Sequence, residues 1–454
     1  MTYISTLNNA LTSLFVKFAN RENLKKFCRD NRIGFNESAF TRNRIFSLRV
    51  ILGYILQPRG HNLFIDGMSF MDGIGANVAS AAAFARRRGL IPEEYLEEFH
   101  RELLSRIYTD GMAPGRWNGH LLLGCDGTTL SIQSTGNLRD YFLRGRKTGK
   151  SDQPLARSVV LKDVVNDIVL GANMECYGDD EIKLAVRLFE GLPEVIRNLL
   201  PVAIFDRKFC AYTLVERLTE MHIGFIIRVK SRFNADVDRF VRSGMKETVC
   251  ILRPGATTLK KLRHMYGNAS EEYRVRLIRC PGDVVVMTSV IDDRSVVDDV
   301  AGTGHDDGAP LPTEELYRLR WTDETTIGFL KNNLEIEIFS STRIPVMYQD
   351  FYSRIVNYNI VTLLARGAAT VRRPRKRQTL HRLGINRNDT LGIVALRFWK
   401  SLVLNNLKDS LPDMLIQIGR NTCPVIPDRH SVRVFRRIKS SGKYITLPNY
   451  RQVI

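Results

Sequence analysis

The chain has 454 residues, of which 44% are hydrophobic and 25% are charged. These proportions are ordinary for a folded protein and exclude global disorder, and the length is enough for two or three domains. The 67 lysines and arginines outnumber the 48 aspartates and glutamates, which gives a formal net charge of +19. Such an excess favours a polyanionic partner, most often nucleic acid, although charge alone would also fit a membrane surface or a ribosome.

The cysteines and the hydropathy of the sequence indicate in which cellular compartment the protein is expected. The seven cysteines are scattered and odd in number, and no pair has C-x-x-C spacing, which argues against a disulfide framework and against a structural zinc site. The N-terminal sequence lacks a basic segment followed by an apolar one, and no run of 18 apolar residues occurs. We therefore expect a protein of the reducing cytoplasm that has no membrane partner.

Residues 1–115 predict a helical N-terminal domain that binds DNA. Apolar residues recur at spacings of three and four in LFVKF, FSLRVILGYIL and EEYLEEFHRELLSRIY. Arginines lie beside apolar anchors in FTRNRIFSLRV and AFARRRGL. This basic face is either a solvated helix surface or a surface laid against the DNA backbone.

The periodicity changes in residues 116–231, which predict the first part of an α/β core. The stretches HLLLGCDGTTLSI, ARSVVLKDVV and DIVLGANM have the character of three strands in an antiparallel meander. A helix in DDEIKLAVRLFEGL, a buried strand in PVAIFD, a helix in CAYTLVERLTEMH and a strand in GFIIRVK follow. Three hairpin-linked strands followed by alternating helix and strand is the ribonuclease-H-like order.

Residues 232–311 predict a β-rich insertion, with strand-like runs in ETVCILRP, EYRVRLIRC and DVVVMTSVI. The core then resumes in residues 312–370. A helix is expected to begin there with Thr313 as its N-cap, and a long helix is expected near residues 345–368. The fold class is therefore a ribonuclease-H-like mixed sheet that is flanked by helices and interrupted by this insertion.

Residues 371–454 form a basic C-terminal region. Eight lysines or arginines and no acid lie between Arg366 and Arg387, ends included. Like charges at this density favour contact with phosphates, and the alternative is a flexible soluble tail. The predicted DNA contacts in this run are Arg373, Arg375 and Arg377.

The stretch YRLRWTDETTIGFLK places four polar residues on one side of a helix. At 100° per residue, Tyr317, Arg320, Glu324 and Lys331 fall within about one sixth of the circumference. Asp323 lies about 120° from the reference position and points elsewhere. The spacing therefore selects Glu324 as the acid of this polar stripe.

Three acids stand out by position: Asp126 in the first predicted strand, Asp206 at the end of the fourth, and Glu324 on the helix. In a ribonuclease-H-like sheet the first and fourth strands are neighbours, so we expect the acids to converge. Carboxylates in one place repel one another unless cations lie between them, and oxygen ligands suit Mg²⁺ or Mn²⁺. Two such ions about 4 Å apart can promote in-line displacement at phosphorus. The three acids are therefore predicted to be catalytic metal ligands, although each alone is more often a turn former or a solvated helix residue.

The pattern Y-x2-R-x3-E-x6-K resembles the signature of DDE transposases of the insertion sequence four family. CDGTTL around Asp126 and FDRKF around Asp206 resemble the first and second acidic motifs of that family, and AFARRRGL resembles its N-terminal region. The resemblance spans nearly the whole chain. It implies a ribonuclease-H-like core with a β-strand insertion, a bound pair of divalent ions, and DNA that is cut and rejoined at the ends of a mobile element.

The same resemblance implies roles for the other polar residues. Tyr317, Arg320 and Lys331 are expected to contact the phosphates near the cleaved end, where arginine offers bidentate geometry. Arg207 follows the second acid directly and is a candidate for DNA backbone contact, with a structural ion pair as an equal alternative.

The expected function is that of a Mg²⁺-dependent transposase of the bacterial cytoplasm and nucleoid. It would bind terminal inverted repeats in double-stranded DNA, free a 3′-hydroxyl at each end and join it to target DNA. Two identical ends favour a homodimer in the synaptic complex. Two alternatives are a catalytically inactive or domesticated DNA-binding relative and a structure-selective DNA nuclease.

Overall fold

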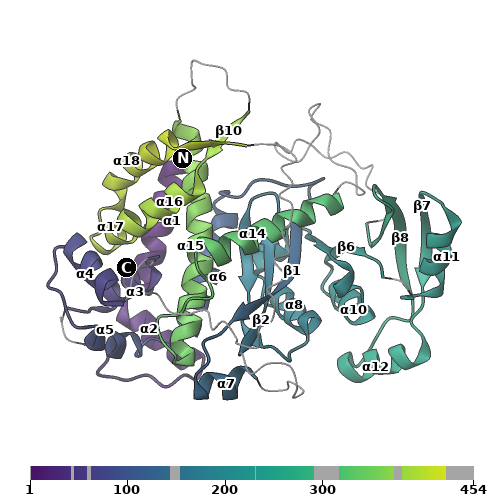
Figure 1. Ribbon diagram of the computed structural model, residues 1–454, viewed down its shortest axis with the longest axis horizontal. Helices are drawn as coiled ribbons and strands as arrows, with labels where there is room; N and C mark the ends of the chain where they lie inside the picture. The colour runs from purple at the N-terminus through teal and green to yellow at the C-terminus, as the bar shows by residue number, and fades with distance from the viewer. Residues whose placement is uncertain are drawn as a thin grey trace, which may run out of the picture.

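A single mixed sheet forms the centre of the protein (Figure 1). The computed structural model describes residues 2–41, 45–58, 63–143, 154–230, 232–290, 316–372 and 381–425. The strand order is β3-β2-β1-β5-β6-β9-β8-β7, and β4 pairs with β2. Helices flank the sheet, as in the predicted ribonuclease-H-like class, which is confirmed.

The first half of the sheet follows the predicted order. Its strands are β1 (Leu122–Ser131), β2 (Leu155–Asp163), β3 (Ile168–Ala172), β4 (Glu175–Cys176), β5 (Val202–Phe205) and β6 (Gly224–Arg228). Strands β1, β2 and β3 form the expected antiparallel meander. Strand β5 lies between β1 and β6 and is parallel to both. The prediction that the first and fourth long strands, here β1 and β5, are neighbours is therefore confirmed.

The two faces of this sheet are buried under different helices. The register of the strands places three apolar side chains on one face and in one hydrophobic cluster: Leu122, Val202 and Ile226. Helix α14 (Trp321–Asn332) lies on this face, whereas α8 (Glu181–Glu190) covers the other. Burial on both faces explains why β5 is a continuous apolar run.

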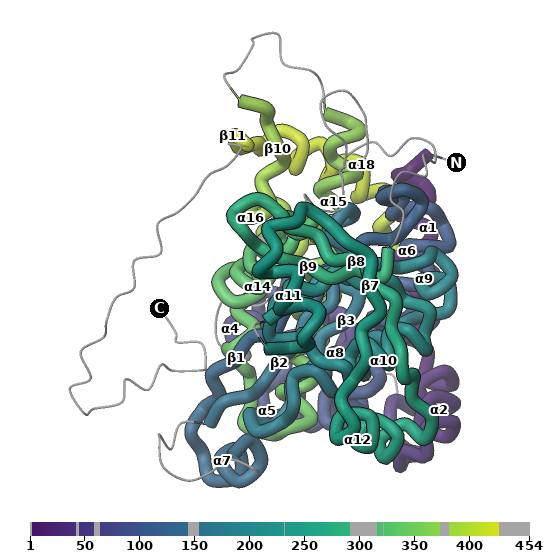
Figure 2. The backbone as a smooth tube through the Cα atoms, turned by 90° about the vertical axis from the view of Figure 1, so that its right-hand side faces the viewer, coloured from purple at the N-terminus to yellow at the C-terminus, as the bar shows by residue number. Residues whose placement is uncertain are grey.

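The predicted insertion continues the same sheet. Strand β9 (Val284–Thr288) pairs antiparallel with β6 and carries β8 (Tyr273–Cys280) and β7 (Glu247–Leu252) outward. Helices α11 (Ala235–Ser243) and α12 (Ala256–Tyr266), which the sequence patterns do not predict, connect these strands. Figure 2 shows β7, β8 and β9 together on the side of the molecule that carries α12.

The N-terminal helices share one hydrophobic core with the last helices of the described chain. They are α1 (Tyr3–Phe18), α2 (Arg21–Asp30), α3 (Leu48–Leu56), α4 (Leu63–Gly73), α5 (Ala81–Arg88) and α6 (Glu94–Thr109). Helix α15 (Ile344–Val371) runs between them and the sheet (Figure 1). Leu14 of α1 and Leu104 of α6 belong to the same cluster as Leu364 of α15. Among the described residues, no helix is long and apolar enough to cross a membrane.

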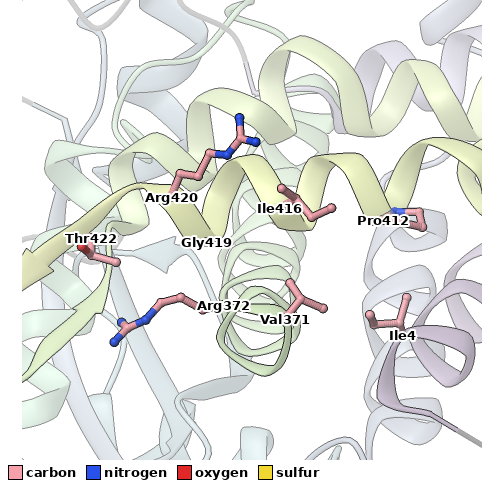
Figure 3. Close-up of a pocket in the computed structure, with 8 residues that line it drawn as sticks. All are labelled: Ile4, Val371, Arg372, Pro412, Ile416, Gly419, Arg420 and Thr422. Carbon is pink, nitrogen blue, oxygen red and sulfur yellow. The ribbon is translucent and has the colours of Figure 1, made fainter. Parts of the chain in front are cut away.

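Part of the region that the sequence characterises only by its charge is folded against this core. It contains β10 (Leu383–Ile385), α16 (Arg387–Ile393), the π-helix η3 (Val394–Phe398), α17 (Trp399–Val403), α18 (Leu407–Arg420) and β11 (Thr422–Pro424). A pocket of about 660 Å³ lies where α1, the end of α15 and α18 meet, with Arg372 and Arg420 at one end (Figure 3). Arg373, Arg375, Arg377 and the basic segment from residue 426 lie outside the described residues, as does Thr313.

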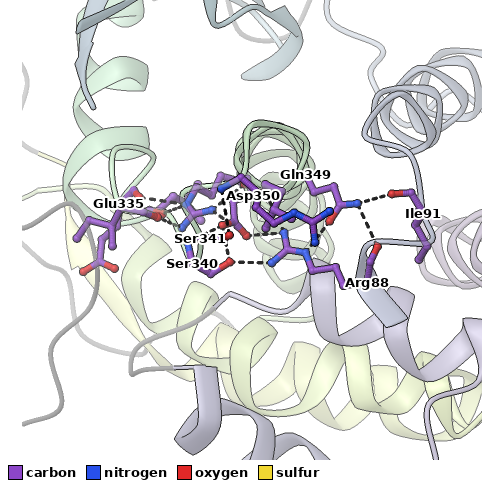
Figure 4. A network of polar contacts seen from close by, with 12 residues as sticks. Arg88, Ile91, Glu335, Ser340, Ser341, Gln349 and Asp350 are labelled. Carbon is purple, nitrogen blue, oxygen red and sulfur yellow. Dashed lines mark hydrogen bonds and ion pairs between the residues drawn. The ribbon is translucent and has the colours of Figure 1, made fainter. Parts of the chain in front are cut away.

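Two of the arginines in AFARRRGL are structural. The guanidinium of Arg88 is 2% exposed and pairs with the fully buried Asp350 of α15 at 2.8 Å (Figure 4). It also donates to Gln349 Oε1 and Ser340 Oγ, while Arg87 donates to the carbonyl oxygen of Phe46. Neither sequence interpretation, a solvated face or a DNA-facing one, applies to Arg88.

Candidate active site

Two of the three predicted acids lie side by side on neighbouring parallel strands. Cys125 of β1 is opposite Phe205 of β5, so Asp126 and Asp206 each follow one residue later. Both belong to the face on which α14 lies, because side chains alternate along a strand. Adjacent strands are about 4.8 Å apart, which brings the two carboxylates within reach of common partners.

Glycines on either side of Asp126 make room for acidic side chains from two helices. A Cβ atom at Gly124 would lie 2.3 Å from the carboxylate oxygens of Asp323. A Cβ atom at Gly127 would lie 1.8 Å from Oε1 of Glu181, on the opposite face. The glycines of the motif GCDG are therefore needed for close packing of α14 and α8 on β1.

The polar stripe begins in a 3-10 helix, η2 (Tyr317–Arg320), and continues in α14. The single α-helix that the sequence spacing assumes is therefore wrong for its first turn. In a 3-10 helix residues three apart eclipse one another, so Tyr317 and Arg320 still share a side. Both side chains are largely buried, at 7% and 9% exposure, and both face the acids rather than solvent.

Arg320 and Tyr317 bind the acids directly. Arg320 Nη2 lies 3.3 Å from Glu324 Oε1, and Nη1 lies 3.7 Å from Asp126 Oδ2. The hydroxyl of Tyr317 donates to Asp206 Oδ1 at 3.3 Å. The guanidinium of Arg320 thus lies between Asp126 and Glu324, and Tyr317 holds Asp206 beside them, although these acids come from positions as far apart in the sequence as 126 and 324.

The pKa values describe a crowded acidic site. Burial raises the pKa of Asp126, and the nearby Glu324 and Asp206 raise it further, while Gly127 N–H and Arg320 oppose the shift. Burial alone would lower the pKa of Arg320, yet Tyr317 and the three acids hold it above its usual value. The arrangement therefore retains a cation among the carboxylates.

Asp323 is a fourth acid next to this group. The spacing places it off the stripe, and its carboxylate indeed lies against Gly124, buried at 4% exposure. Neither of its oxygens has a hydrogen-bond partner among the described residues. Burial raises the pKa of Asp323 to about 7, and the repulsion from Asp126 and Glu324 acts in the same direction.

The donor set fits hard divalent cations. Asp126, Asp206 and Glu324 offer only oxygen ligands, which Mg²⁺ and Mn²⁺ prefer, and they already share a positive partner in Arg320. As the side chains stand, no three histidine, cysteine, aspartate or glutamate side chains in the described part of the chain are arranged to hold a metal ion. Arg320 and the ions would therefore compete for the same carboxylates.

The other predicted contacts lie further from this group. Lys331 is near the end of α14, where its ammonium donates to the carbonyl oxygen of Thr129 at 2.6 Å and lies 3.5 Å from Glu337. Arg207 is exposed in η1 (Arg207–Phe209), and its side chain makes no ion pair within the ranges that the structure describes. The structural ion pair near this position belongs to Lys208, which binds Glu181.

Arg228 is a residue that the sequence patterns do not identify. It ends β6, and since Ile227 is opposite Phe205, Arg228 is level with Asp206 on the same face. Burial raises the pKa of Tyr317, while Arg320 and Arg228 act in the opposite direction, which places Arg228 at the tyrosine hydroxyl. In the sequence GFIIRVK nothing distinguishes Arg228 from other polar residues at strand ends. Only the register of the sheet shows that it lies level with Asp206.

A ribonuclease-H-like sheet with an acidic group where the parallel pairing of β1 and β5 ends defines the class to which this protein belongs. The model of the transposase DDE domain family matches residues 117–360, more than half of the 454 residues, and the chain belongs to this family. The finer resemblance to the insertion sequence four family stays a prediction.

Among solved structures, the chain is similar to a piggyBac transposase in a synaptic complex with hairpin DNA, at 13% sequence identity and a TM-score of 0.45. The match covers 91% of this chain and 86% of that one. No curated protein sequence matches the chain significantly.

Proposed function

We propose that the protein is a DNA transposase that hydrolyses a phosphodiester at each end of an insertion sequence and joins the freed 3′-hydroxyl to target DNA. The observation that carries this proposal is the grouping of Asp126 and Glu324 at Arg320, with Asp206 held beside them by Tyr317, where the parallel pairing of β1 and β5 ends. Membership of the transposase DDE domain family supports the same reaction class.

Asp126, Asp206 and Glu324 would hold two divalent ions, Mg²⁺ or Mn²⁺. When bound, such ions activate the attacking oxygen and stabilise the leaving oxygen of an in-line displacement. The remaining tasks fall to the protein side chains. Arg320 and Arg228, which both lie near Tyr317, offer guanidinium groups that can bind one phosphate bidentately and fix its orientation.

Tyr317 and Lys331 can contact further phosphates of the same DNA strand. The hydroxyl of Tyr317 already donates to Asp206 and can donate to a phosphate oxygen instead. The ammonium of Lys331 has three donors and uses two of them, on the carbonyl oxygen of Thr129 and on Glu337 Oε1, so its third donor can contact a phosphate. Arg207, exposed beside Asp206, would contact the backbone further from the cut bond.

The partners follow from the reaction. Terminal inverted repeats in double-stranded DNA would be the substrate, and two identical ends would be held by a homodimer. The net charge of +19 supports binding to a polyanion. Arg373, Arg375 and Arg377 are proposed to add phosphate contacts outside the active site.

The decisive experiment compares two neighbouring acids of α14. Glu324→Gln should lower Mg²⁺-dependent cleavage of end DNA by at least about 10³-fold, because a metal ligand is lost, while DNA binding stays within a few-fold of wild type. Asp126→Asn and Asp206→Asn should behave alike. The matched control is Asp323→Asn, which should retain most of the cleavage. Wild-type cleavage by Glu324→Gln would overturn the assignment.

Two further assays separate the alternatives. A catalytically inactive relative would show no metal-dependent nicking of end DNA by the wild-type protein. A structure-selective nuclease would nick DNA but would not join a pre-cut end with a free 3′-hydroxyl to a plasmid. We expect both nicking and joining.

A further inference from the structure

A pocket of about 540 Å³ lies where the catalytic half of the sheet meets the inserted segment. Helices α10 (Tyr212–Glu220), α11 and α12 surround it, and Figures 1 and 2 show all three near the β6–β7 end of the sheet. It is open to solvent on one side and separate from the acids described above. Its chemistry indicates what it binds.

The lining of the pocket is cationic. It includes Lys230, Arg232, Arg253 and Lys261 but no aspartate or glutamate. Arg253 is balanced by Glu272, at 2.6 Å. The other three side chains have no ion pair with any described residue, so three positive charges face the pocket without a bound acid. Such a concentration of charge raises the local concentration of anions.

Backbone polarity adds to this charge. The pocket is lined by Tyr212 and Ala235, the first residues of α10 and α11, and by Gly255 and Thr258 at the start of α12. No side chain caps the N-terminus of α10 or α12, so amide N–H groups of their first turns are available. The positive ends of helix dipoles favour bound anions, and phosphate is the usual one.

No other group in the lining opposes a phosphate. Burial raises the pKa of the Cys210 thiol to about 11, so it stays neutral near pH 7. The ring of Tyr212 stacks on Phe233 with centroids 4.7 Å apart, and its hydroxyl is held by Asn234 at 2.9 Å. These contacts fix one wall of the pocket, so that a bound group would meet preset donors.

The pocket lies beyond the ends of β5 and β6, and α10, which lines it, packs beside α8 on the face of the sheet opposite the acids. Lys230 follows Arg228 by two residues, which is about 7 Å along an extended chain, and Cys210 follows Asp206 by four. A DNA strand that passes from Arg228 over this end of the sheet would meet Lys230 with a neighbouring phosphate.

We propose that this pocket binds a DNA backbone phosphate close to the phosphodiester that is cut. The assignment rests on the proposed function for its ligand. Lys230, Arg232 and Lys261 supply the charge, and the first turns of α10 and α12 supply N–H donors. The pocket thereby fixes the path of the DNA between the active site and the inserted segment.

The test replaces the three free cations together, in the variant Lys230→Gln/Arg232→Gln/Lys261→Gln of the full chain. The control, Lys183→Gln/Arg187→Gln/Arg197→Gln, removes the same charge from exposed positions on α8 and on α9 (Glu194–Arg197). Binding of a fluorescent end duplex is measured between about 50 and 200 mM salt. The pocket variant should bind at least about tenfold more weakly and lower the slope of log K against log salt by about 2 to 3, whereas the control should change the slope much less.

A second arm uses inorganic phosphate. At constant ionic strength it should raise the Tm of the wild type and of the control, but not that of the pocket variant. Equal Tm values without phosphate would show that the pocket variant is folded. An unchanged phosphate response and an unchanged salt slope in the pocket variant would overturn the proposal.

The two arms distinguish the failure of the pocket from the failure of the function. A phosphate response that depends on the pocket, together with an unchanged DNA slope, would mean that the site binds free phosphate or a phosphorylated small molecule and would overturn the DNA assignment. If the wild type bound no DNA at all, the proposed function would fail, and the phosphate arm would still decide whether the pocket binds anions.

Discussion

At the scale of single residues, Arg320 determines the state of the acidic group. Its guanidinium lies 3.3 Å from Glu324 and 3.7 Å from Asp126, so the carboxylates are already partly neutralised. A divalent ion that enters must share these oxygens with a fixed positive charge. The same guanidinium is the best placed donor for a phosphate, which would draw it away from the acids.

Replacing Arg320 should therefore separate metal affinity from catalysis. Like charges 4 Å apart near a protein surface repel by about 1 to 4 kcal/mol, and about 1.4 kcal/mol is a tenfold change in affinity. In Arg320→Gln we expect Mn²⁺ to bind about tenfold more tightly in the absence of DNA, as measured by electron paramagnetic resonance. Cleavage of end DNA should nevertheless fall, because a phosphate contact is lost.

The matched control is Lys331→Gln. The ammonium of Lys331 lies against the carbonyl oxygen of Thr129 and Glu337 rather than against the three acids, so its removal should leave Mn²⁺ affinity nearly unchanged. Unchanged or weaker Mn²⁺ binding by Arg320→Gln would show that the guanidinium does not compete with metal ions.

At the scale of elements, helix α6 is held to β3 by a buried histidine. Nε2 of His100 donates to the carbonyl oxygen of Val169 at 3.1 Å. The residue is 5% exposed, and burial lowers its pKa from 6.5 to about 4. The neutral form is therefore the one compatible with the packing of α6 on the sheet.

This shift predicts a pH dependence of stability with a definite sign. The unfolded chain protonates His100 near pH 6.5, whereas the folded chain does so only near pH 4, so the stability is fully present above pH 6.5 and is lost as the pH falls through 4. The loss is roughly 3 kcal/mol. The variant His100→Gln has no histidine to protonate at this position, so its stability lacks this pH dependence. The difference in unfolding free energy between wild type and variant should therefore shrink by roughly 3 kcal/mol from pH 7 to pH 4. Urea titrations at both pH values measure it, and a constant difference would contradict the assignment.

Hydrophobic periodicity was sufficient for the elements that carry the acids. The apolar runs before Asp126 and before Asp206 each predict a strand, and the order of these strands along the chain predicts that the two are neighbours, as the structure shows. Helices α11 and α12 are short and lie among strands, so turn-rich and β-like patterns masked them. The positions of Arg228 and Asp323 depend on sheet register and on the space above Gly124, which no local pattern encodes.

At the scale of the whole molecule, helix α15 joins the N-terminal helices to the central sheet. Val356, Ile360 and Leu364 lie in the core shared with α1 and α6, whereas Phe351 and Ile355 pack in the cluster beneath α14. Because α15 is buried on nearly all sides, the N-terminal helices and the sheet cannot move independently of each other. We therefore expect the N-terminal helices and the sheet to unfold in one cooperative transition.

The buried pair of Arg88 and Asp350 tests this connection, because it links α5 to α15 across 262 positions of sequence. Breaking a buried ion pair by removing one partner costs about 3 to 5 kcal/mol, since a buried charge is left uncompensated. Arg88→Met should lie near the lower end of this range, because Ser340 N and Oγ still donate to Asp350 at 2.7 Å.

The control Arg86→Met, on the exposed side of the same helix, should change stability by no more than about 0.5 kcal/mol. Adding Asp350→Asn to Arg88→Met should recover part of the loss, because it removes a buried charge that Arg354, at 3.9 Å, compensates only in part. Denaturant unfolding followed by circular dichroism measures all four proteins, and equal effects of the Arg88 and Arg86 replacements would show that the pair does not hold α5 to α15.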